Sequence, residues 1–161
     1  LKQTNVKTSQ KHTCAIALSV QHLGDKWSLL LLRDMIVHKK TRFKEFRSSK
    51  EKIATNVLTN RLKHLQAEGF IKKLDPLGTK KSTRYIATDK GISSLPIIIE
   101  LYLFSIQSID ESILDESQLR IKDEICNDRA FFEAKRKEAY LDFITDLKQS
   151  LEVSNLLVEA S

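Results

Sequence analysis

Glycine and proline are scarce in this chain, with four glycines and two prolines among 161 residues. Both residues interrupt regular structure, so their scarcity indicates few loops and a mainly helical fold. No apolar run approaches the ~20 residues that a bilayer-spanning helix needs, and no signal-peptide pattern precedes the first predicted helix. We therefore expect a cytoplasmic protein that has no contact with a membrane.

Cysteine is also rare, and Cys14 and Cys126 lie too far apart to match a zinc-binding spacing. The four histidines are scattered along the chain at His12, His22, His38 and His64. The sequence contains no glycine-rich phosphate loop and no Ser/His/Asp or Cys/His pattern with motif spacing. Cys14 with His12 as its base is a weak nucleophile candidate, because the pair falls at a predicted mobile arm. We expect no metal, no cofactor and no enzymatic activity.

The net charge of +6 conceals an uneven distribution of charge along the chain. Residues 1–90 hold 20 Lys and Arg against 7 Asp and Glu, whereas residues 91–161 hold 7 against 14. A basic first part followed by an acidic second part indicates a polyanion-binding surface on the first part only. A solvated lysine-rich surface is the alternative explanation.

The spacing of apolar residues predicts the order of elements between Cys14 and Ile109. A helix ending at Gly24 precedes an apolar helix capped by Asp25, and a short strand at Thr41 and Arg42 precedes a short helix. A helix over 55–68 follows, and then the segments FIKKLD and TRYIAT bracket the turn PLGTKKS as an antiparallel hairpin. One last helix is predicted from Thr88, with Pro96 in its first turns. This order is that of a winged helix-turn-helix fold.

The acidic remainder of the chain is also predicted to be helical. Apolar residues form a stripe on a long segment over 128–151, and a shorter helix is expected before it. The core, the two helices themselves and a second subunit are all possible partners for these faces. The predicted architecture is mainly α with a small β-wing. It comprises a flexible basic arm (1–12), a winged helix-turn-helix domain for DNA binding and dimerisation (13–110) and an acidic helical extension (111–161).

The helix over 55–68 has the chemistry of a helix that reads DNA. Its leucines face inward and turn small polar and basic residues outward, namely Thr55, Asn56, Thr59, Asn60 and Lys63. Asn pairs with adenine N6 and N7, and Thr contacts base acceptors or the thymine methyl group in the major groove. Cations of the hairpin then reach phosphates or the minor groove: Lys72, Lys73, Lys80, Lys81 and Arg84. The alternative is a surface helix whose polar residues are only solvated.

The sequence resembles the HxlR-type bacterial transcriptional regulators over roughly residues 12–107. The resemblance rests on CAIALSVQHLGDKWSLLLLRDM, RFKEF, VLTNRLKHLQAEGFI and RYIATDKG. It implies a homodimeric winged-helix regulator that binds palindromic promoter sites and pairs through its first and last helices. The implied dimer interface contains Ile16, Val20, Ile98, Tyr102 and Ile106. The recognition-helix positions that the resemblance implies are Asn56, Thr59, Asn60, Arg61 and Lys63.

The chain departs from the family pattern at three places. It has Cys14-Ala15 where the family usually has Cys-Pro, and it has Lys52-Ile53-Ala54 where Gly-Ile-Ser is common. The second change removes a turn glycine and a helix-capping serine just before the recognition helix. On the wing, Lys80, Lys81 and Ser82 replace a Pro-Pro-Arg motif, which keeps the charge but loses the arginine geometry.

Cys14 is a candidate redox or electrophile sensor, because it begins a predicted helix close behind Lys11 and His12. Nearby cations and a helix N-terminus favour the reactive thiolate, and oxidation to a disulfide would then shift the dimer between states. The alternative is an inert thiol packed at an interface. Two other functions remain open: a regulator controlled by a small ligand held among the apolar helices of 97–151, and a winged helix that docks proteins instead of DNA.

Overall fold

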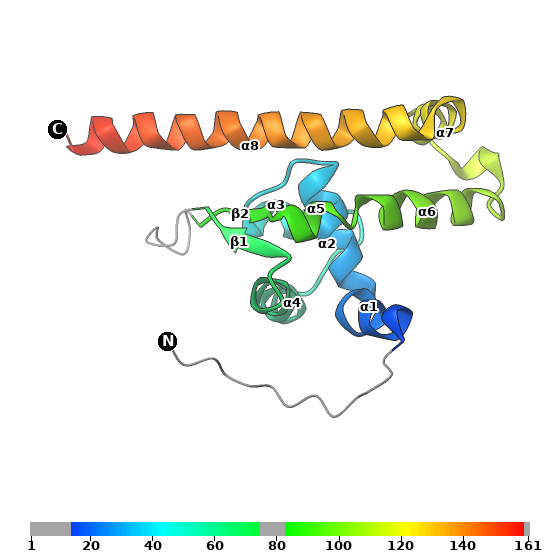
Figure 1. Cartoon of the computed structure of the whole chain (residues 1–161), viewed down its shortest axis with the longest axis horizontal. Helices are drawn as coiled ribbons and strands as arrows, with labels where there is room; N and C mark the ends of the chain where they lie inside the picture. The colour runs from blue at the N-terminus through cyan, green and yellow to red at the C-terminus, as the bar shows by residue number, and fades with distance from the viewer. Residues whose placement is uncertain (1–13, 75–82, 160–161) are drawn as a thin grey trace.

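The computed structural model describes residues 14–74 and 83–159, with side chains described through residue 153 (Figure 1). It confirms the prediction of a mainly helical fold with a two-stranded antiparallel sheet. The winged-helix part contains α1 (Ala15–Leu23), α2 (Lys26–Ile36), α3 (Phe43–Arg47), α4 (Thr55–Ala67), β1 (Ile71–Lys73), β2 (Tyr85–Ala87), α5 (Asp89–Ile92) and α6 (Leu95–Ile106). The extension contains η1 (Glu111–Ile113), α7 (Glu116–Asn127) and α8 (Arg129–Glu159). The predicted arm, residues 1–12, lies outside the described residues.

Helix α2 lies at the centre of the core, as its apolar sequence predicts. The Asp25 carboxylate caps it by accepting hydrogen bonds from the backbone N–H groups of Trp27 and Ser28, at 2.9 and 3.1 Å. Leu32 and Met35 are completely buried, and α2 packs against α1, α4, α6, α8 and β2. The segment KWSLLLLRDMIVHK predicted a helix over 26–39, but the helix ends at Ile36, and Lys39 in the following turn has a left-handed φ of 55°.

Helix α4 packs on this core through Leu58, Leu62 and Leu65, which are all buried. It ends before Gly69, whose φ of +74° is the left-handed conformation that glycine adopts at low cost. Strands β1 and β2 then form the base of the wing, with Ile71 opposite Ala87 and Lys73 opposite Tyr85.

The predicted strand at Thr41 and Arg42 is a single bridge between Arg42 and Arg84. The backbone N–H of Tyr85 also donates to the carbonyl oxygen of Thr41, at 2.7 Å. These bonds attach the wing to the segment that enters α3.

The prediction of one helix starting after Thr88 is wrong, because the structure has two. Thr88 caps the short helix α5 by accepting from the N–H of Gly91 at 3.2 Å, and α6 then begins at Leu95. Pro96 has no N–H to continue the hydrogen bonding of α5, but it fits the first turn of a new helix.

The extension packs on the winged-helix core and shares its apolar interior. Ile125, Phe132, Tyr140 and Ile144 are buried in the same cluster as the leucines of α2 and α4. The hydroxyl oxygen of Tyr140 accepts a hydrogen bond from the backbone N–H of Ala87 at 2.8 Å, and burial raises the pKa of this tyrosine to about 12. The sequence left three possible partners for the apolar faces of the extension, and these four residues pack against the winged-helix core.

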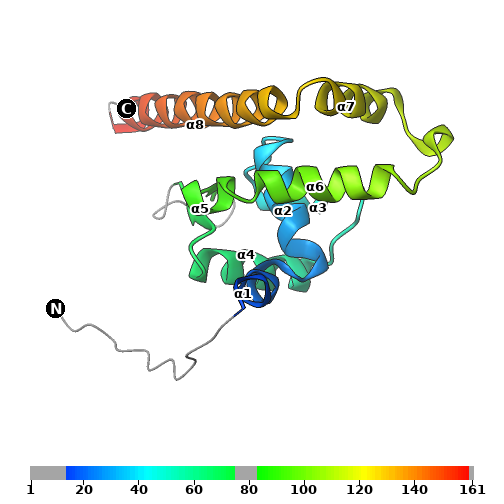
Figure 2. The same ribbon diagram turned by 45° about the vertical axis from the view of Figure 1, so that its right-hand side comes forward.

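The two faces of the molecule differ in the elements that they present. Helix α8 runs along one side of the core and α4 lies on the opposite side, as both views show (Figures 1 and 2). In the described part of the chain, no helix combines the length and the apolar character needed to span a bilayer.

Candidate DNA-binding surface

The outward face of α4 carries the polar residues that the sequence assigned to base reading. Thr55, Asn56, Asn60 and Lys63 are exposed, and Thr59 is half-buried. The structure therefore brings these predicted residues together on one solvent-facing helix surface, opposite the leucine stripe. An exposed helix with amides, hydroxyls and one cation on a single face has the groups that a major groove can pair with.

Two of these side chains make local hydrogen bonds along the helix. The Thr59 hydroxyl donates to the carbonyl oxygen of Thr55 at 2.9 Å, so its methyl group is the part available for an apolar contact. The Asn56 side-chain oxygen accepts from the N–H of Val57 at 2.9 Å, which leaves its NH₂ group to donate. Asn60 lies one turn further along the same exposed face.

Arg61 has a partner within the chain that the sequence did not indicate. One guanidinium nitrogen lies 3.1 Å from a carboxylate oxygen of Asp25, the residue that caps α2. Burial alone would raise the pKa of Asp25, but hydrogen bonds from Ser28 and Trp27 and the charge of Arg61 outweigh it, so the pKa lies below its usual value. Arg61 thus joins the middle of α4 to the start of α2 and positions the helix.

The turn before α4 contains two positions at which the chain departs from the family pattern. Lys52, at the position of the missing glycine, has a left-handed φ of 53°. Ala54, at the position of the missing serine, is the N-cap residue and makes no side-chain capping bond. The sequence therefore places a strained residue and an uncapped helix start directly beside the reading face.

The base of the wing carries a group of cations. Lys72 and Lys73 on β1 are exposed, and one Arg84 guanidinium nitrogen donates to the Thr41 hydroxyl at 2.8 Å. Partial burial and the neighbouring charge of Arg42 lower the pKa of Arg84. Sequence reasoning missed Arg42 as a member of this group, although it had predicted the strand that brings Arg42 there. Lys80 and Lys81 lie outside the described residues.

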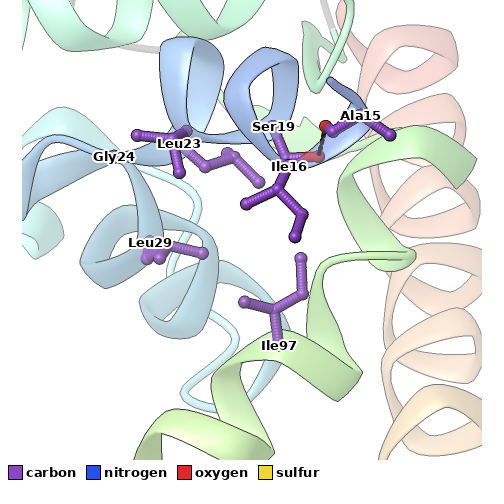
Figure 3. Close-up of a pocket in the computed structure, with 8 residues that line it drawn as sticks. Ala15, Ile16, Ser19, Leu23, Gly24, Leu29 and Ile97 are labelled. Carbon is purple, nitrogen blue, oxygen red and sulfur yellow. Dashed lines mark hydrogen bonds between the residues drawn. The ribbon is translucent and has the colours of Figure 1, made fainter.

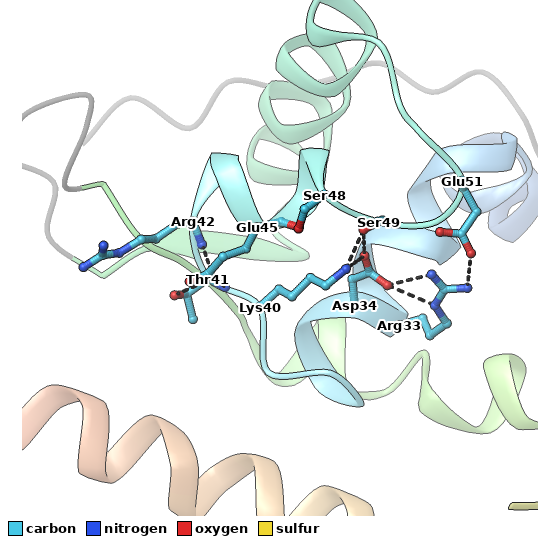
Figure 4. Close-up of polar contacts among 9 residues, drawn as sticks. All are labelled: Arg33, Asp34, Lys40, Thr41, Arg42, Glu45, Ser48, Ser49 and Glu51. Atoms are coloured by element: carbon cyan, nitrogen blue, oxygen red, sulfur yellow. Dashed lines mark hydrogen bonds and ion pairs between the residues drawn. The ribbon is translucent and has the colours of Figure 1, made fainter. Parts of the chain in front are cut away.

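An ionic network around the buried Asp34 fixes the turn between α3 and α4 to α2 (Figure 4). Asp34, only 2% exposed, accepts from the Arg33 guanidinium at 2.7 and 3.1 Å, from the Lys40 ammonium at 2.9 Å and from the Ser49 hydroxyl. Arg33 also donates to Glu51 at 2.8 Å. Burial would raise the pKa of Asp34, but the bonds from Lys40, Ser49 and Arg33 hold it below its usual value.

The predicted dimer-interface residues separate into two groups. Ile16 and Val20 on α1 are 74% and 60% exposed, and they line a cavity of about 310 Å³ with Ile97 of α6; Ile16 and Ile97 point toward each other there (Figure 3). Ile98, Tyr102 and Ile106 are half-buried, and the Tyr102 hydroxyl donates to the carbonyl oxygen of Gln118 on α7, at 2.7 Å. The exposed apolar residues of α6 are Ile97, Leu101 and Phe104.

Cys14 is exposed and occupies the N-cap position of α1, as the sequence predicted. Cys126 is also exposed, on α7. Within residues 14–74 and 83–159, no group of three or more His, Cys, Asp or Glu side chains is arranged to hold a metal ion.

The fold, the helix-turn-helix of α3 and α4 and the wing define a winged-helix protein of the transcription-regulator type. The family model described as HxlR-like helix-turn-helix matches residues 22–113, more than half of the chain. The chain therefore belongs to the HxlR-like helix-turn-helix family and is a transcriptional regulator of the helix-turn-helix type. This agrees with the expectation that it is not an enzyme. The family match ends before α7, so most of the extension lies outside it.

Similar proteins support this assignment. The chain is 31% identical over 97 residues to the HTH-type transcriptional regulator YvaP of Bacillus subtilis, covering 60% of this chain and 89% of YvaP. It is 30% identical over 96 residues to an HTH-type transcriptional regulator of Halalkalibacterium halodurans, covering 60% and 83%. Among solved structures, the redox regulator HypR in its oxidized form is similar with a TM-score of 0.53 and 26% identity, covering 60% of this chain and 99% of HypR.

Proposed function

We propose that this protein acts as a homodimer that binds specific DNA sequences and regulates transcription from them. The observation that carries the proposal is the exposed polar face of α4 beside the cationic base of the wing. Thr55, Asn56, Asn60 and Lys63 would read bases in a major groove. Lys72 and Lys73 would contact phosphates of the flanking backbone.

Homodimer formation is supported by the apolar surface shared by α1 and α6. Ile16 and Val20 of α1, and Leu101 and Phe104 of α6, are large apolar side chains exposed on neighbouring elements. Contiguous exposed apolar surface of this kind marks a protein interface. The proposed surface includes the two α1 residues that the sequence implied. On α6 it is formed by Leu101 and Phe104, and the expected Ile98 and Tyr102 lie on the adjacent, half-buried face. A two-fold dimer would present two α4 helices to half-sites about 34–36 Å apart, or a multiple of that spacing.

The test of DNA binding is a fluorescence-anisotropy titration of the full chain on duplex DNA from upstream of its own gene. A scrambled duplex of the same length and composition is the control. We expect tighter binding to the native duplex, and a steep loss of affinity with salt because each phosphate contact releases counterions. Negligible binding to both duplexes at low salt would overturn the proposal and favour a protein-docking module.

We further propose that Cys14 makes DNA binding responsive to oxidants. Its exposure at the start of α1, beside the proposed dimer surface, supports this role, as does the similarity to the oxidized form of a redox regulator. Diamide would take two electrons and two protons from a pair of thiols and join them as a disulfide, either between subunits or with Cys126.

The same titration tests this role when the reduced protein is compared with the diamide-treated protein. We expect diamide to change the affinity of the wild type and to have no effect on the Cys14→Ser variant. Non-reducing electrophoresis of Cys126→Ser separates the two pairings, because only an intersubunit disulfide survives in that variant. Equal responses of wild type and Cys14→Ser would remove Cys14 from the mechanism.

A further inference from the structure

An apolar cavity lies where the extension covers the winged-helix core. It has a volume of about 170 Å³ and lies between α2, α6, α7 and α8. Its apolar lining includes Ile98 of α6, Ile121 and Ile125 of α7, and Phe132 of α8. All of α7 and α8 lie outside the family match, so four of the eleven residues that line this cavity, Gln118, Ile121, Ile125 and Phe132, come from outside it.

The volume of the cavity limits the size of the ligand that it can bind. An apolar cavity of about 150 Å³ lined by aliphatic and aromatic side chains is enough to bind benzene in another protein. A cavity of about 170 Å³ therefore has room for a single six-membered ring, but not for a drug-sized ligand, whose sites are about 300 Å³ or more.

A polar cavity of about 330 Å³ adjoins the apolar one and shares three lining residues with it, namely Arg33, His38 and Gln118. A ring in the apolar cavity would therefore have its substituent directed at a polar rim. The Arg33 guanidinium of this rim already pairs with both Asp34 and Glu51.

The other charges around the polar cavity are also paired. The Lys40 ammonium pairs with Asp34, and the Lys50 ammonium lies 3.8 Å from Asp115. Partial burial lowers the pKa of His38, which favours the neutral form of its ring. A charged substituent would have to displace one of these ion pairs, whereas a hydroxyl could hydrogen-bond to the neutral groups of His38 or Gln118.

We propose that the cavity between α2, α6, α7 and α8 binds a small, uncharged, monocyclic aromatic molecule that carries a hydroxyl group. The ring lies among Ile98, Ile121 and Phe132, and the hydroxyl points toward His38 and Gln118. This site does not depend on DNA binding, so a failure of the DNA-binding proposal would leave it standing.

Phenol is the probe, with toluene and benzoate as comparisons. Binding to the full chain is measured by saturation-transfer NMR and by amide chemical-shift changes in the ¹⁵N-labelled protein. We expect a phenol Kd on the order of millimolar or tighter, because so small a ligand has a limited affinity per atom. Toluene should bind several-fold more weakly because it lacks one hydrogen bond, and benzoate most weakly of the three.

Two phenylalanine substitutions on α6 give a matched pair. Ile98→Phe adds ring atoms to the cavity and should weaken phenol binding about tenfold or more. Ile97→Phe, one residue away and lining the cavity between α1 and α6, should leave the phenol Kd unchanged within about twofold. Equal phenol binding by folded Ile98→Phe and wild type would overturn the proposal.

The chemical-shift map of the wild type decides the question even if Ile98→Phe does not fold. We expect the largest shifts at the amides of Gln118, Ile121 and Ile125, and none at Asn56 or Asn60 on α4. The absence of saturation transfer from phenol and toluene, or shifts confined to other surfaces, would overturn the site. Toluene binding as tightly as phenol would overturn the assignment of the hydroxyl.

Discussion

At the scale of single residues, Asn60 and Asn56 differ in what their amides have left to offer. The Asn56 oxygen is already an acceptor for the N–H of Val57, whereas Asn60 is exposed in the middle of the same face. A bidentate contact with adenine needs both the oxygen and the NH₂ group of one amide. Asn60 is therefore the better candidate for sequence-specific reading.

Replacing Asn60 by alanine should weaken binding to the native duplex by about 1–3 kcal/mol, because one bidentate base contact is lost. Binding to a scrambled duplex should change little, since phosphate contacts remain. Anisotropy titrations on both duplexes measure the difference. Asn127→Ala, which removes an exposed amide from α7, is the control and should match wild type. An equal loss on both duplexes would mean that Asn60 does not read a base.

Asp34 has a structural role that can be measured separately from DNA binding. It is buried and holds Arg33, Lys40 and Ser49 around the turn that leads to α4. Asp34→Asn should lower the free energy of unfolding at pH 7 by about 3 kcal/mol, because the two cations lose their buried counter-charge. Urea unfolding followed by circular dichroism measures this, with exposed Asp142→Asn as the control.

The same variant tests the pH dependence. The pKa of Asp34 in the folded protein lies below its usual 3.8, so the ionised carboxylate stabilises the fold above about pH 4. That stabilisation is lost as the pH falls toward the folded-state pKa. The difference in unfolding free energy between wild type and Asp34→Asn should therefore shrink below about pH 4. A difference that stays constant down to pH 3 would show that the charge of Asp34 does not stabilise the fold.

At the scale of elements, the start of α4 has a strained backbone position and no side-chain cap. Lys52 has a left-handed backbone conformation that costs an L-residue other than glycine roughly 1 kcal/mol. Lys52→Gly should raise the free energy of unfolding by about that amount and raise Tm by several degrees. Lys50→Gly, two residues earlier and outside the left-handed region, should leave Tm unchanged or lower it. A lower Tm for Lys52→Gly would contradict the strain.

The same elements show how far sequence reasoning reaches. The leucine spacing of α4 and the Pro/Gly turn of the wing are local patterns, so the helix-turn-helix and the hairpin could be predicted. Arg61 could not be assigned its partner, because Asp25 lies 36 residues earlier in the chain. Helix α6 is apolar on more than one face, so periodicity could not decide whether Ile98 or Ile97 faces outward. In the structure, Ile98 lies beside Ile121 and Ile125 of α7, and Ile97 is exposed.

At the scale of the whole molecule, a single substitution that introduces a charge tests the proposed dimer surface. Leu101→Glu places a carboxylate in the exposed apolar surface of α6, and burying it in an interface should weaken dimerisation about 100-fold or more. Leu141→Glu makes the same change at a similarly exposed position on α8. Sedimentation velocity over a range of concentrations should show a monomer for the first variant and a dimer for the second. Dimers of equal affinity would place the interface elsewhere.

The contact between α8 and the sheet predicts what a truncating mutation would do to the protein. A stop codon just after the family-matched segment would remove the Tyr140 hydroxyl that accepts from the N–H of Ala87. It would also uncover the apolar side of α6 that Ile125 and Phe132 now cover. Such a shortened product would be a target for cellular proteases, because it exposes apolar surface and an unpaired amide. A reporter fused in frame therefore belongs after α8, where it leaves these contacts intact.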